Sequence, residues 1–382
     1  MCSVVAGNVG RNSWTLPPKT KREEEREKKS MNKEINDTIV KPIKRKPLLH
    51  KIFKYLLIFF GSVTLLVLTF VAWIYFTLIA GPGLFDINEF HPFKSPKAKA
   101  EYLAFEENMA KKWPVISEEK TVSTSFGQTF MRISGPVDAP PLVLLPGGGS
   151  NSLIWDANIE AFSKEYRTYA LDNIYDWGRS VYVRKIENGQ DFSNWLDELF
   201  DTLQLGNSIR LAGYSYGGWV ASQYALYCPE RLANVVFIAP AWTILDVPKE
   251  YLLKMVKSIL PIRFFKKEII YWVWKDLAET DDDGKQRVED RIEYYQMAMK
   301  CFKLKAGVQP TILTDDELLN FKMPVLYIVG ENETCYDGES AINRLHQISP
   351  HIETFFIRGT GHDLMFTHTD MVNGRILEFL GE

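Results

Sequence analysis

Three patterns of hydrophobic and polar positions follow one another along the chain. The first is one long apolar stretch, residues 55–80, in which no residue carries a charge. Beyond residue 120, short apolar runs recur, and segments with helical apolar spacing separate most of them. Between residues 242 and 321 this alternation gives way to a helical pattern rich in aromatic residues. The chain is therefore predicted to combine a membrane-length helix with a domain of alternating strands and helices.

The short apolar runs predict a sheet of eight strands. Residues 121–126 and 128–134 alternate around Gly127 and predict a hairpin. The remaining runs are typical of buried parallel strands and cover residues 142–145, 168–171, 209–212, 235–238, 325–329 and 354–357. Strands that alternate with helices indicate an α/β fold with a mostly parallel sheet.

These patterns divide the chain into six expected parts. They are a basic, disordered cytoplasmic tail (1–54), a transmembrane helix (55–80), a linker and helix (81–119), a first core part (120–241), a helical cap (242–321) and a second core part (322–382). The tail includes a run of Lys, Arg and Glu that ends just before Met31, which is an alternative start of the protein.

The apolar stretch 55–80 is long enough to span a bilayer. Six Lys or Arg residues lie between positions 41 and 54 with no acidic residue among them, whereas Asp86 and Glu89 carry the first charges after the stretch. This asymmetry predicts a cytoplasmic N-terminus and an extracellular domain. Trp73 and Tyr75 would lie near the outer interface. A cleaved signal peptide is the alternative, but Leu78-Ile79-Ala80 matches a cleavage site poorly.

Composition narrows the function classes. Hydrophobic residues make up 46% of the chain, charged residues 24%, and the formal net charge is −3, so the balance is that of a globular protein and does not suggest nucleic acid binding. Cys2, Cys228, Cys301 and Cys335 are widely spaced and form no C-x-x-C pair. They predict neither a metal site nor a disulfide framework, and we expect no cofactor.

One motif stands out as a candidate nucleophile. Residues 213–217 read Gly-Tyr-Ser-Tyr-Gly, which has the form G-x-S-x-G. A strand-like run precedes it and a helical pattern follows, which is the context that this motif requires. The strained turn exposes the serine hydroxyl, and the glycines remove side chains that would crowd it. We therefore predict Ser215 as the nucleophile.

A serine hydroxyl needs an adjacent base, which is usually a histidine. Among six histidines, His362 follows a predicted strand in the glycine-rich loop Gly-Thr-Gly-His-Asp at 359–363. A histidine in such a loop can reach the carboxyl edge of the sheet, so His362 is the predicted base. The other histidines lie in helical stretches, at a strand start or near the apolar segment.

The acid that orients this histidine should lie between the serine and the histidine in chain order. The strand 325–329 leads into Gly-Glu-Asn-Glu at 330–333, on the catalytic side of a parallel sheet. Glu333 is the first choice and Glu331 the second, while Asp337 and Asp246 fit less well.

Acyl transfer also needs donors for the oxyanion. Pro146-Gly147-Gly148-Gly149 follows the first buried strand, and its backbone N–H groups can point into the site. The N–H of Tyr216, just after the nucleophile, supplies the second donor. This glycine turn lacks the Lys-Ser/Thr ending of a P-loop, so phosphate binding is disfavoured.

From about residue 120 onward the chain resembles the α/β-hydrolase superfamily. The resemblance rests on residues 145–149, 213–218, Gly361-His362 and the turn 176–180, which reads Asp-Trp-Gly-Arg-Ser. It implies an eight-stranded, mostly parallel sheet with a cap after the sixth strand. It also implies a triad of Ser215, His362 and one acid, and an oxyanion hole formed by Gly147 or Gly148 with Tyr216. Two departures are the glutamate at 333, where many members have Asp, and Pro146, where many have His.

These features predict a membrane-anchored serine hydrolase that cleaves small-molecule carboxylic esters through an acyl-enzyme. The aromatic insertion suggests an apolar acyl or aryl group. Other outcomes on the same triad are a peptidase, a thioesterase, an acyltransferase or a C–C bond hydrolase. A non-catalytic membrane-anchored binding module is the alternative from a different class.

Overall fold

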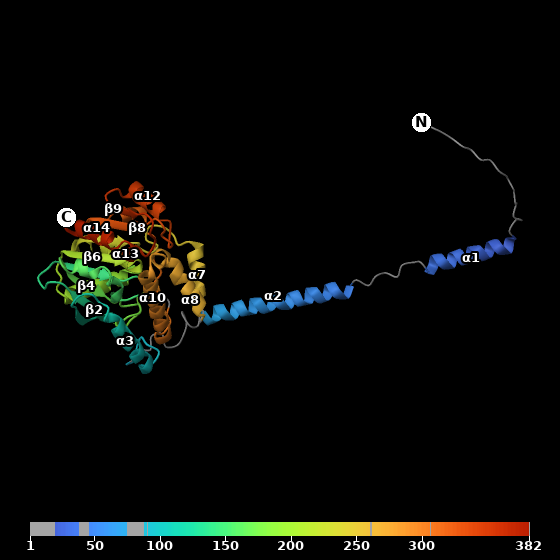
Figure 1. The fold of residues 1–382 in the computed structure, drawn as a ribbon, viewed down its shortest axis with the longest axis horizontal. Helices are drawn as coiled ribbons and strands as arrows, with labels where there is room; N and C mark the ends of the chain where they lie inside the picture. The colour runs from blue at the N-terminus through green and yellow to red at the C-terminus, as the bar shows by residue number, and fades with distance from the viewer. Residues whose placement is uncertain are drawn as a thin grey trace, which may run out of the picture. The chain divides into compact units, whose positions relative to one another are not determined.

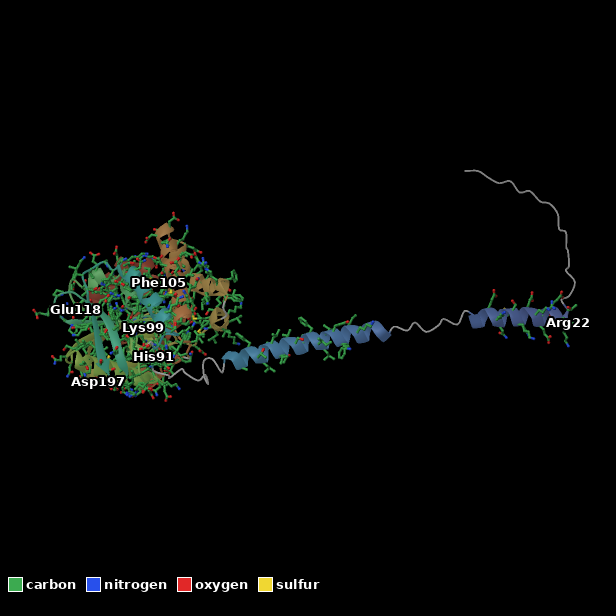
Figure 2. All side chains as sticks on the ribbon, turned by 90° about the horizontal axis from the view of Figure 1, so that it is seen from below. Arg22, His91, Lys99, Phe105, Glu118 and Asp197 are labelled. Atoms are coloured by element: carbon green, nitrogen blue, oxygen red, sulfur yellow. The ribbon has the colours of Figure 1, made fainter. Side chains whose placement is uncertain are left out.

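The computed structural model describes residues 20–37, 46–74, 88–89, 91–259, 262–305 and 307–381. The chain forms two compact units, Met1–Ala72 and Trp73–Glu382. The first unit contains the helix α1 (Lys21–Asp37) and all but the last two residues of the helix α2 (Lys46–Ile74), both shown in blue in Figure 1. Figure 2 shows the side chains of α1, including Arg22, projecting outward from the helix.

Two expectations for the N-terminal part change. Residues 21–37 were expected to belong to a disordered tail but form α1, because Lys, Arg and Glu are good helix formers. The predicted membrane helix begins earlier than residue 55, since α2 starts at Lys46. Within α2, the stretch Lys51–Phe70 has a mean hydropathy of 2.1, which makes it long and apolar enough to cross a membrane. Residues 75–80 of the expected span, and the side chain of Trp73, lie outside the described part of the chain.

The second unit is built on a nine-stranded sheet with the order β1-β2-β4-β3-β6-β7-β8-β9, and β5 pairs with β2. The strands are β1 (Glu118–Thr124), β2 (Gly127–Ser134), β3 (Pro141–Leu145), β4 (Arg167–Leu171), β5 (Val181–Tyr182), β6 (Ile209–Tyr214), β7 (Leu232–Ile238), β8 (Val325–Gly330) and β9 (Glu353–Ile357). The pairs that involve β2 are antiparallel and the others are parallel. The eight predicted strands are confirmed, and the two-residue strand β5 is an addition.

Both faces of this sheet are covered. In β3, Val143 and Leu145 join one hydrophobic cluster and Leu142 and Leu144 the other, as the alternation of side chains along a strand requires. The first cluster includes α5 (Gly189–Thr202), α6 (Tyr216–Tyr227) and α12 (Gly338–Ile348). The second includes α4 (Ile159–Phe162), α13 (Leu364–Thr367) and α14 (Thr369–Gly381). Burial on both faces explains why these strands read as continuous apolar runs.

A helical insertion stands between β7 and β8, shown in yellow to orange in Figure 1. We use this name for α7 (Lys249–Ile259), α8 (Arg263–Val273), α9 (Lys275–Ala278) and α10 (Asp282–Cys301). The short helix α11 (Asp315–Leu319) then leads back to the sheet.

The helix α3 (Pro96–Ala110) contacts both the insertion and the sheet. Tyr102 of α3 and Tyr294 of α10 share a buried hydrogen bond of 3.0 Å between their hydroxyl groups. On its other side, α3 is tied to β2 by a buried ion pair, in which Arg132 donates to Glu106 at 2.6 Å. Breaking one partner of such a pair typically costs about 3–5 kcal/mol, because the other charge stays buried. Therefore α3 links the sheet to the insertion.

Candidate active site

Ser215 occupies the turn between β6 and α6. Its backbone has φ 52° and ψ −117°, a conformation that non-glycine residues rarely adopt. Its N–H donates to the carbonyl of Ile238 at 2.8 Å, and its carbonyl accepts from the N–H of Ala241 at 3.0 Å. These bonds to the end of β7 and to the loop that follows it hold the strained turn in place. The predicted strand–turn–helix context is confirmed.

The glycines beside Ser215 are required by close backbone approach. A Cβ atom on Gly213 would lie 2.2 Å from the carbonyl oxygen of Gly217. One on Gly217 would lie 2.5 Å from the carbonyl oxygen of Leu145, on the neighbouring strand β3. Neither site has room for a side chain, so the sequence pattern follows from the geometry of the turn.

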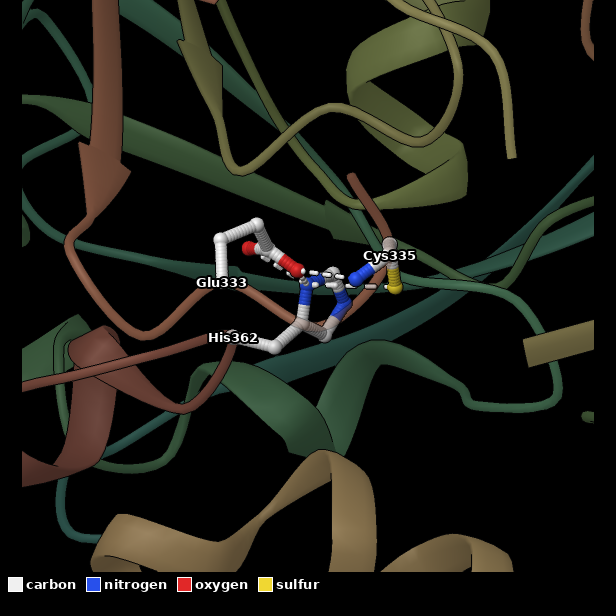
Figure 3. Close-up of side chains that lie close together, drawn as sticks. All are labelled: Glu333, Cys335 and His362. Atoms are coloured by element: carbon white, nitrogen blue, oxygen red, sulfur yellow. Dashed lines mark hydrogen bonds and ion pairs between the residues drawn. The ribbon is translucent and has the colours of Figure 1, made fainter. Parts of the chain in front are cut away.

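His362 and Glu333 meet Ser215 from two separate loops. The Nε2 atom of His362 lies 2.9 Å from Oγ of Ser215, and its Nδ1 atom lies 2.9 and 3.0 Å from the two carboxylate oxygens of Glu333. Figure 3 shows the Glu333 and His362 side chains facing one another. The Glu333 carboxylate is fully buried. With the proton on Nδ1 held by this carboxylate, Nε2 is free to accept from the serine hydroxyl.

The other candidate acids have different partners. Glu331 is exposed and accepts from the N–H of Gly359 at 2.9 Å. Asp337 caps α12 by accepting from the N–H of Ser340. Asp246 is exposed and accepts from the N–H of Val247. Among the candidate acids, Glu333 is the one whose described hydrogen bonds include His362.

Cys335 is a neighbour that the sequence did not indicate. Its N–H donates to Glu333 at 2.8 Å, and its Sγ atom lies 3.7 Å from Nδ1 of His362 (Figure 3). Burial raises the pKa of the Cys335 thiol, so the thiol stays neutral near pH 7. Glu333, Cys335 and His362 each offer one atom that could bind a metal ion, and these atoms lie within 4.8 Å of one another. However, Nδ1 of His362 is already hydrogen-bonded to the Glu333 carboxylate.

Opposing effects set the basicity of His362. Burial lowers the pKa of its imidazole, whereas the Glu333 carboxylate at 2.9 Å raises it, and the net direction is upward. Because the thiol is neutral, we assign the upward effect to the Glu333 carboxylate. The imidazole is thereby made a stronger base than a free histidine.

The predicted oxyanion donors lie beside the serine. A Cβ atom on Gly147 would lie 3.3 Å from Cβ of Ser215, and one on Gly148 would lie 3.4 Å from Cβ of Tyr216. Gly147, Gly148, Ser215 and Tyr216 all line one cavity. The backbone N–H and carbonyl of the next residue, Gly149, both have side-chain partners.

Asp176 accepts from the N–H of Gly149 at 2.8 Å, and Arg291 of α10 donates to the Gly149 carbonyl at 2.9 Å. Gly149 itself has φ +63°, which suits glycine. Sequence reasoning noted the turn that contains Asp176 but missed its contact with Gly149, and it missed Arg291 altogether. The position of Arg291 in a predicted helix gave no indication that its side chain contacts Gly149.

The cavity that contains Ser215 and His362 measures about 370 Å³. Its aromatic lining comes from the core and from the insertion region: Tyr175, Trp177, Tyr214, Tyr216, Trp242, Tyr251, Trp274 and Tyr295. Four of these residues, Trp242, Tyr251, Trp274 and Tyr295, belong to the aromatic-rich stretch 242–321 noted in the sequence. A cavity of this size and lining suits a small organic molecule.

Comparisons with known proteins agree with this geometry. The sequence model of the "Alpha/beta hydrolase family" matches residues 142–375. Carboxylesterase YbfK of Bacillus subtilis (strain 168) is 34% identical over 280 residues, which cover 73% of this chain and 93% of the relative. The "Uncharacterized carboxylesterase nap" of the same organism is 32% identical over 269 residues, which cover 70% of this chain and 88% of the relative. The crystal structure of naproxen esterase from Bacillus subtilis superposes with a TM-score of 0.69 at 29% identity, and covers 75% of this chain and 99% of its own.

Proposed function

The chain belongs to the alpha/beta hydrolase family and is a serine hydrolase of carboxylic esters, and on that premise we propose that Ser215, His362 and Glu333 form its catalytic triad. The observation that carries this assignment is the continuous line of hydrogen bonds from the serine Oγ through both imidazole nitrogens to the buried carboxylate. Each of the three groups comes from a different loop at the carboxyl edge of the sheet. Their convergence is the geometry that nucleophilic acyl transfer needs.

The reaction follows from these positions. Oγ of Ser215 attacks the acyl carbon while Nε2 of His362 takes the hydroxyl proton, and the Glu333 carboxylate stabilises the resulting imidazolium. The backbone N–H groups of Tyr216 and of Gly147 or Gly148 stabilise the tetrahedral oxyanion. His362 then protonates the leaving alcohol. Water, deprotonated by the same histidine, hydrolyses the acyl-enzyme and releases the acid.

A fluorophosphonate probe tests the nucleophile. Wild-type protein is expected to be labelled, Ser215→Ala is expected to lose labelling, and Ser208→Ala, at an exposed position, is a matched control that keeps it. An unlabelled wild-type protein would overturn the triad, and equal labelling of Ser215→Ala would point to a different nucleophile.

The same triad supports other acyl transfers, and a non-catalytic module would keep the fold without the chemistry. The 32–34% identity to carboxylesterases favours ester substrates over peptides, thioesters and C–C bonds. A panel of matched ester, thioester and amide substrates with one acyl group separates these outcomes, and hydrolysis of the ester at the highest kcat/KM is expected.

For the location of the protein, we propose that α2 anchors the chain as an uncleaved single-pass helix with a cytoplasmic N-terminus. The support is the apolar stretch Lys51–Phe70 and the basic residues that precede it. The catalytic unit, with core parts 120–241 and 322–382 and a cap at 242–321, would then be extracellular. Protease added to intact cells is expected to digest this unit, and protection of the unit would overturn the orientation.

A further inference from the structure

Two cationic side chains line the cavity that contains Ser215. Arg291 extends from α10, and Lys305 follows the end of that helix. Among the described residues of the cavity wall, Asp176 is the one carboxylate. Two positive groups and one negative group leave this part of the wall with a formal charge of +1. The reaction in the previous section uses none of these three charges directly.

Arg291 has most of its hydrogen-bonding capacity left. One guanidinium nitrogen donates to the carbonyl of Gly149, and the group lies 5.6 Å from the ring centre of Trp274 and 5.3 Å from that of Tyr294. A guanidinium carries five N–H donors, and the described residues give Arg291 no carboxylate partner at hydrogen-bond distance. Burial also lowers the pKa of Arg291, because the charged guanidinium has lost part of its hydration.

Lys305 is held by aromatic faces rather than by an acid. Its ammonium lies 4.7 Å from the ring centre of Tyr175 and 5.1 Å from that of Tyr182. Burial lowers the pKa of Lys305, and Asp176 opposes this effect from a distance. The described contacts again include no hydrogen bond to a carboxylate.

The carboxylate nearest to these cations is hydrogen-bonded to the backbone rather than to either cation. Asp176 accepts from the N–H of Gly149 at 2.8 Å and from the N–H of its neighbour Trp177 at 2.7 Å, so each of its oxygens already has one backbone donor. A single carboxylate also balances only one of two positive charges. Desolvated charges without a hydrogen-bonded counterion are unfavourable, and a carboxylate on a ligand would supply that counterion.

We propose that this cavity binds esters that carry a carboxylate away from the scissile bond, and that Arg291 and Lys305 recognise that carboxylate. A guanidinium matches a carboxylate with two parallel hydrogen bonds, and an ammonium adds a point charge beside it. The aromatic lining then accommodates the apolar body of the same molecule. This inference rests on the proposed function, because it names the substrate class of that site.

Matched substrates test the inference with the full-length protein. Mono-4-nitrophenyl glutarate and 4-nitrophenyl pentanoate share a leaving group and differ by a carboxylate in place of a terminal methyl. We expect Lys305→Gln to lower kcat/KM for the glutarate about 10- to 100-fold, chiefly through KM, and to change the pentanoate less than about threefold. Lys249→Gln, a lysine on α7 outside the cavity lining, is the control and should change neither.

Arg291 needs a conservative variant, because its bond to Gly149 also supports the oxyanion loop, by which we mean the glycine turn 147–149. Arg291→Lys keeps the charge and removes the two-pronged geometry, and we expect it to lower glutarate hydrolysis more than pentanoate hydrolysis. A second substrate pair, 4-acetoxybenzoate and phenyl acetate, places the carboxylate on the alcohol side. If Lys305→Gln lowers kcat/KM for 4-acetoxybenzoate rather than for the glutarate, the carboxylate that Lys305 recognises belongs to the leaving group.

The outcomes separate this inference from the proposed function. If the fluorophosphonate probe labels wild-type protein and Lys305→Gln at equal rates, both chains are folded and have an active serine. An unchanged preference between charged and neutral esters in both pairs would then refute carboxylate recognition alone, and the cations would serve only to balance Asp176. If wild-type protein is not labelled, the triad itself fails.

Discussion

Replacement of Glu333 by Gln tests the acid of the proposed triad. The two carboxylate oxygens lie 2.9 and 3.0 Å from Nδ1 of His362, and the side chain is fully buried, so water cannot take over its role. Gln has the same shape, but its NH₂ group can donate to Nδ1 and leave the proton on Nε2. The imidazole in that tautomer cannot accept the proton of Ser215.

The expected loss is large. The equivalent carboxylate-to-amide change in a serine-protease triad lowers kcat about 10⁴-fold. At about 1.4 kcal/mol for each factor of ten, this corresponds to about 5 kcal/mol of lost transition-state stabilisation. We expect kcat of Glu333→Gln to fall by about this factor, with little change in KM.

The pH profile supplies a second readout with a definite sign. Burial lowers the pKa of His362, and the carboxylate raises it above the usual value. The base must be unprotonated, so kcat/KM falls as the pH falls through this pKa. Without the carboxylate the lowering effect of burial on this pKa loses its main opposition, so the acidic limb of the residual activity should move to lower pH.

Hydrolysis of a 4-nitrophenyl ester between pH 5 and 9 provides the assay. Glu331→Gln is the matched control, because Glu331 is exposed and accepts from the N–H of Gly359. We expect this control to change kcat less than about threefold. A wild-type rate for Glu333→Gln, or a larger loss for Glu331→Gln, would refute the assignment of the acid.

Two further predictions concern stability. Gly217→Ala would place a Cβ atom 2.6 Å from the carbonyl oxygen of Pro146 and should destabilise the fold by about 3 kcal/mol or more. Gly374→Ala lies in open space on α14 and should be neutral or stabilising by up to about 1 kcal/mol. Urea unfolding compares the two variants, and equal unfolding midpoints would contradict the packing argument. Burial raises the pKa of Asp363 from 3.8 to about 6, although the N–H of Leu277 donates to it. The native state therefore holds this proton more tightly than the unfolded state, and about 3 kcal/mol of stability present below pH 4 is lost as the pH rises through 6. Asp363→Asn should remove this part of the pH dependence, and coincident stability–pH curves for the two proteins would show that the carboxyl does not contribute.

The parts of the molecule that depend on local sequence could be predicted. The buried strands are continuous apolar runs because helices cover both faces of the sheet. Ser215 and His362 each stand in a glycine-rich turn next to such a run, so their positions followed from neighbouring residues. The two-residue strand β5 was missed, because pairing with the edge of β2 defines it and no apolar run marks it.

The choice between Glu331 and Glu333 shows where sequence reasoning stopped. Both are glutamates just after β8, and no residue pattern separates them. The structure separates them through contacts with distant parts of the chain, since Glu331 bonds to Gly359 and Glu333 to His362. Arg291 was missed for a similar reason, because its contact with the oxyanion loop joins residues that are far apart in sequence.

The strained backbone of Ser215 sets activity against stability. Its φ of 52° is a conformation that costs a non-glycine residue about 1–3 kcal/mol, whereas glycine adopts positive φ freely. A glycine at this position would thus relieve the strain and yield a more stable chain without a nucleophile. At this position the chain therefore gives up stability for a nucleophile, which is the trade-off expected where activity needs a strained residue.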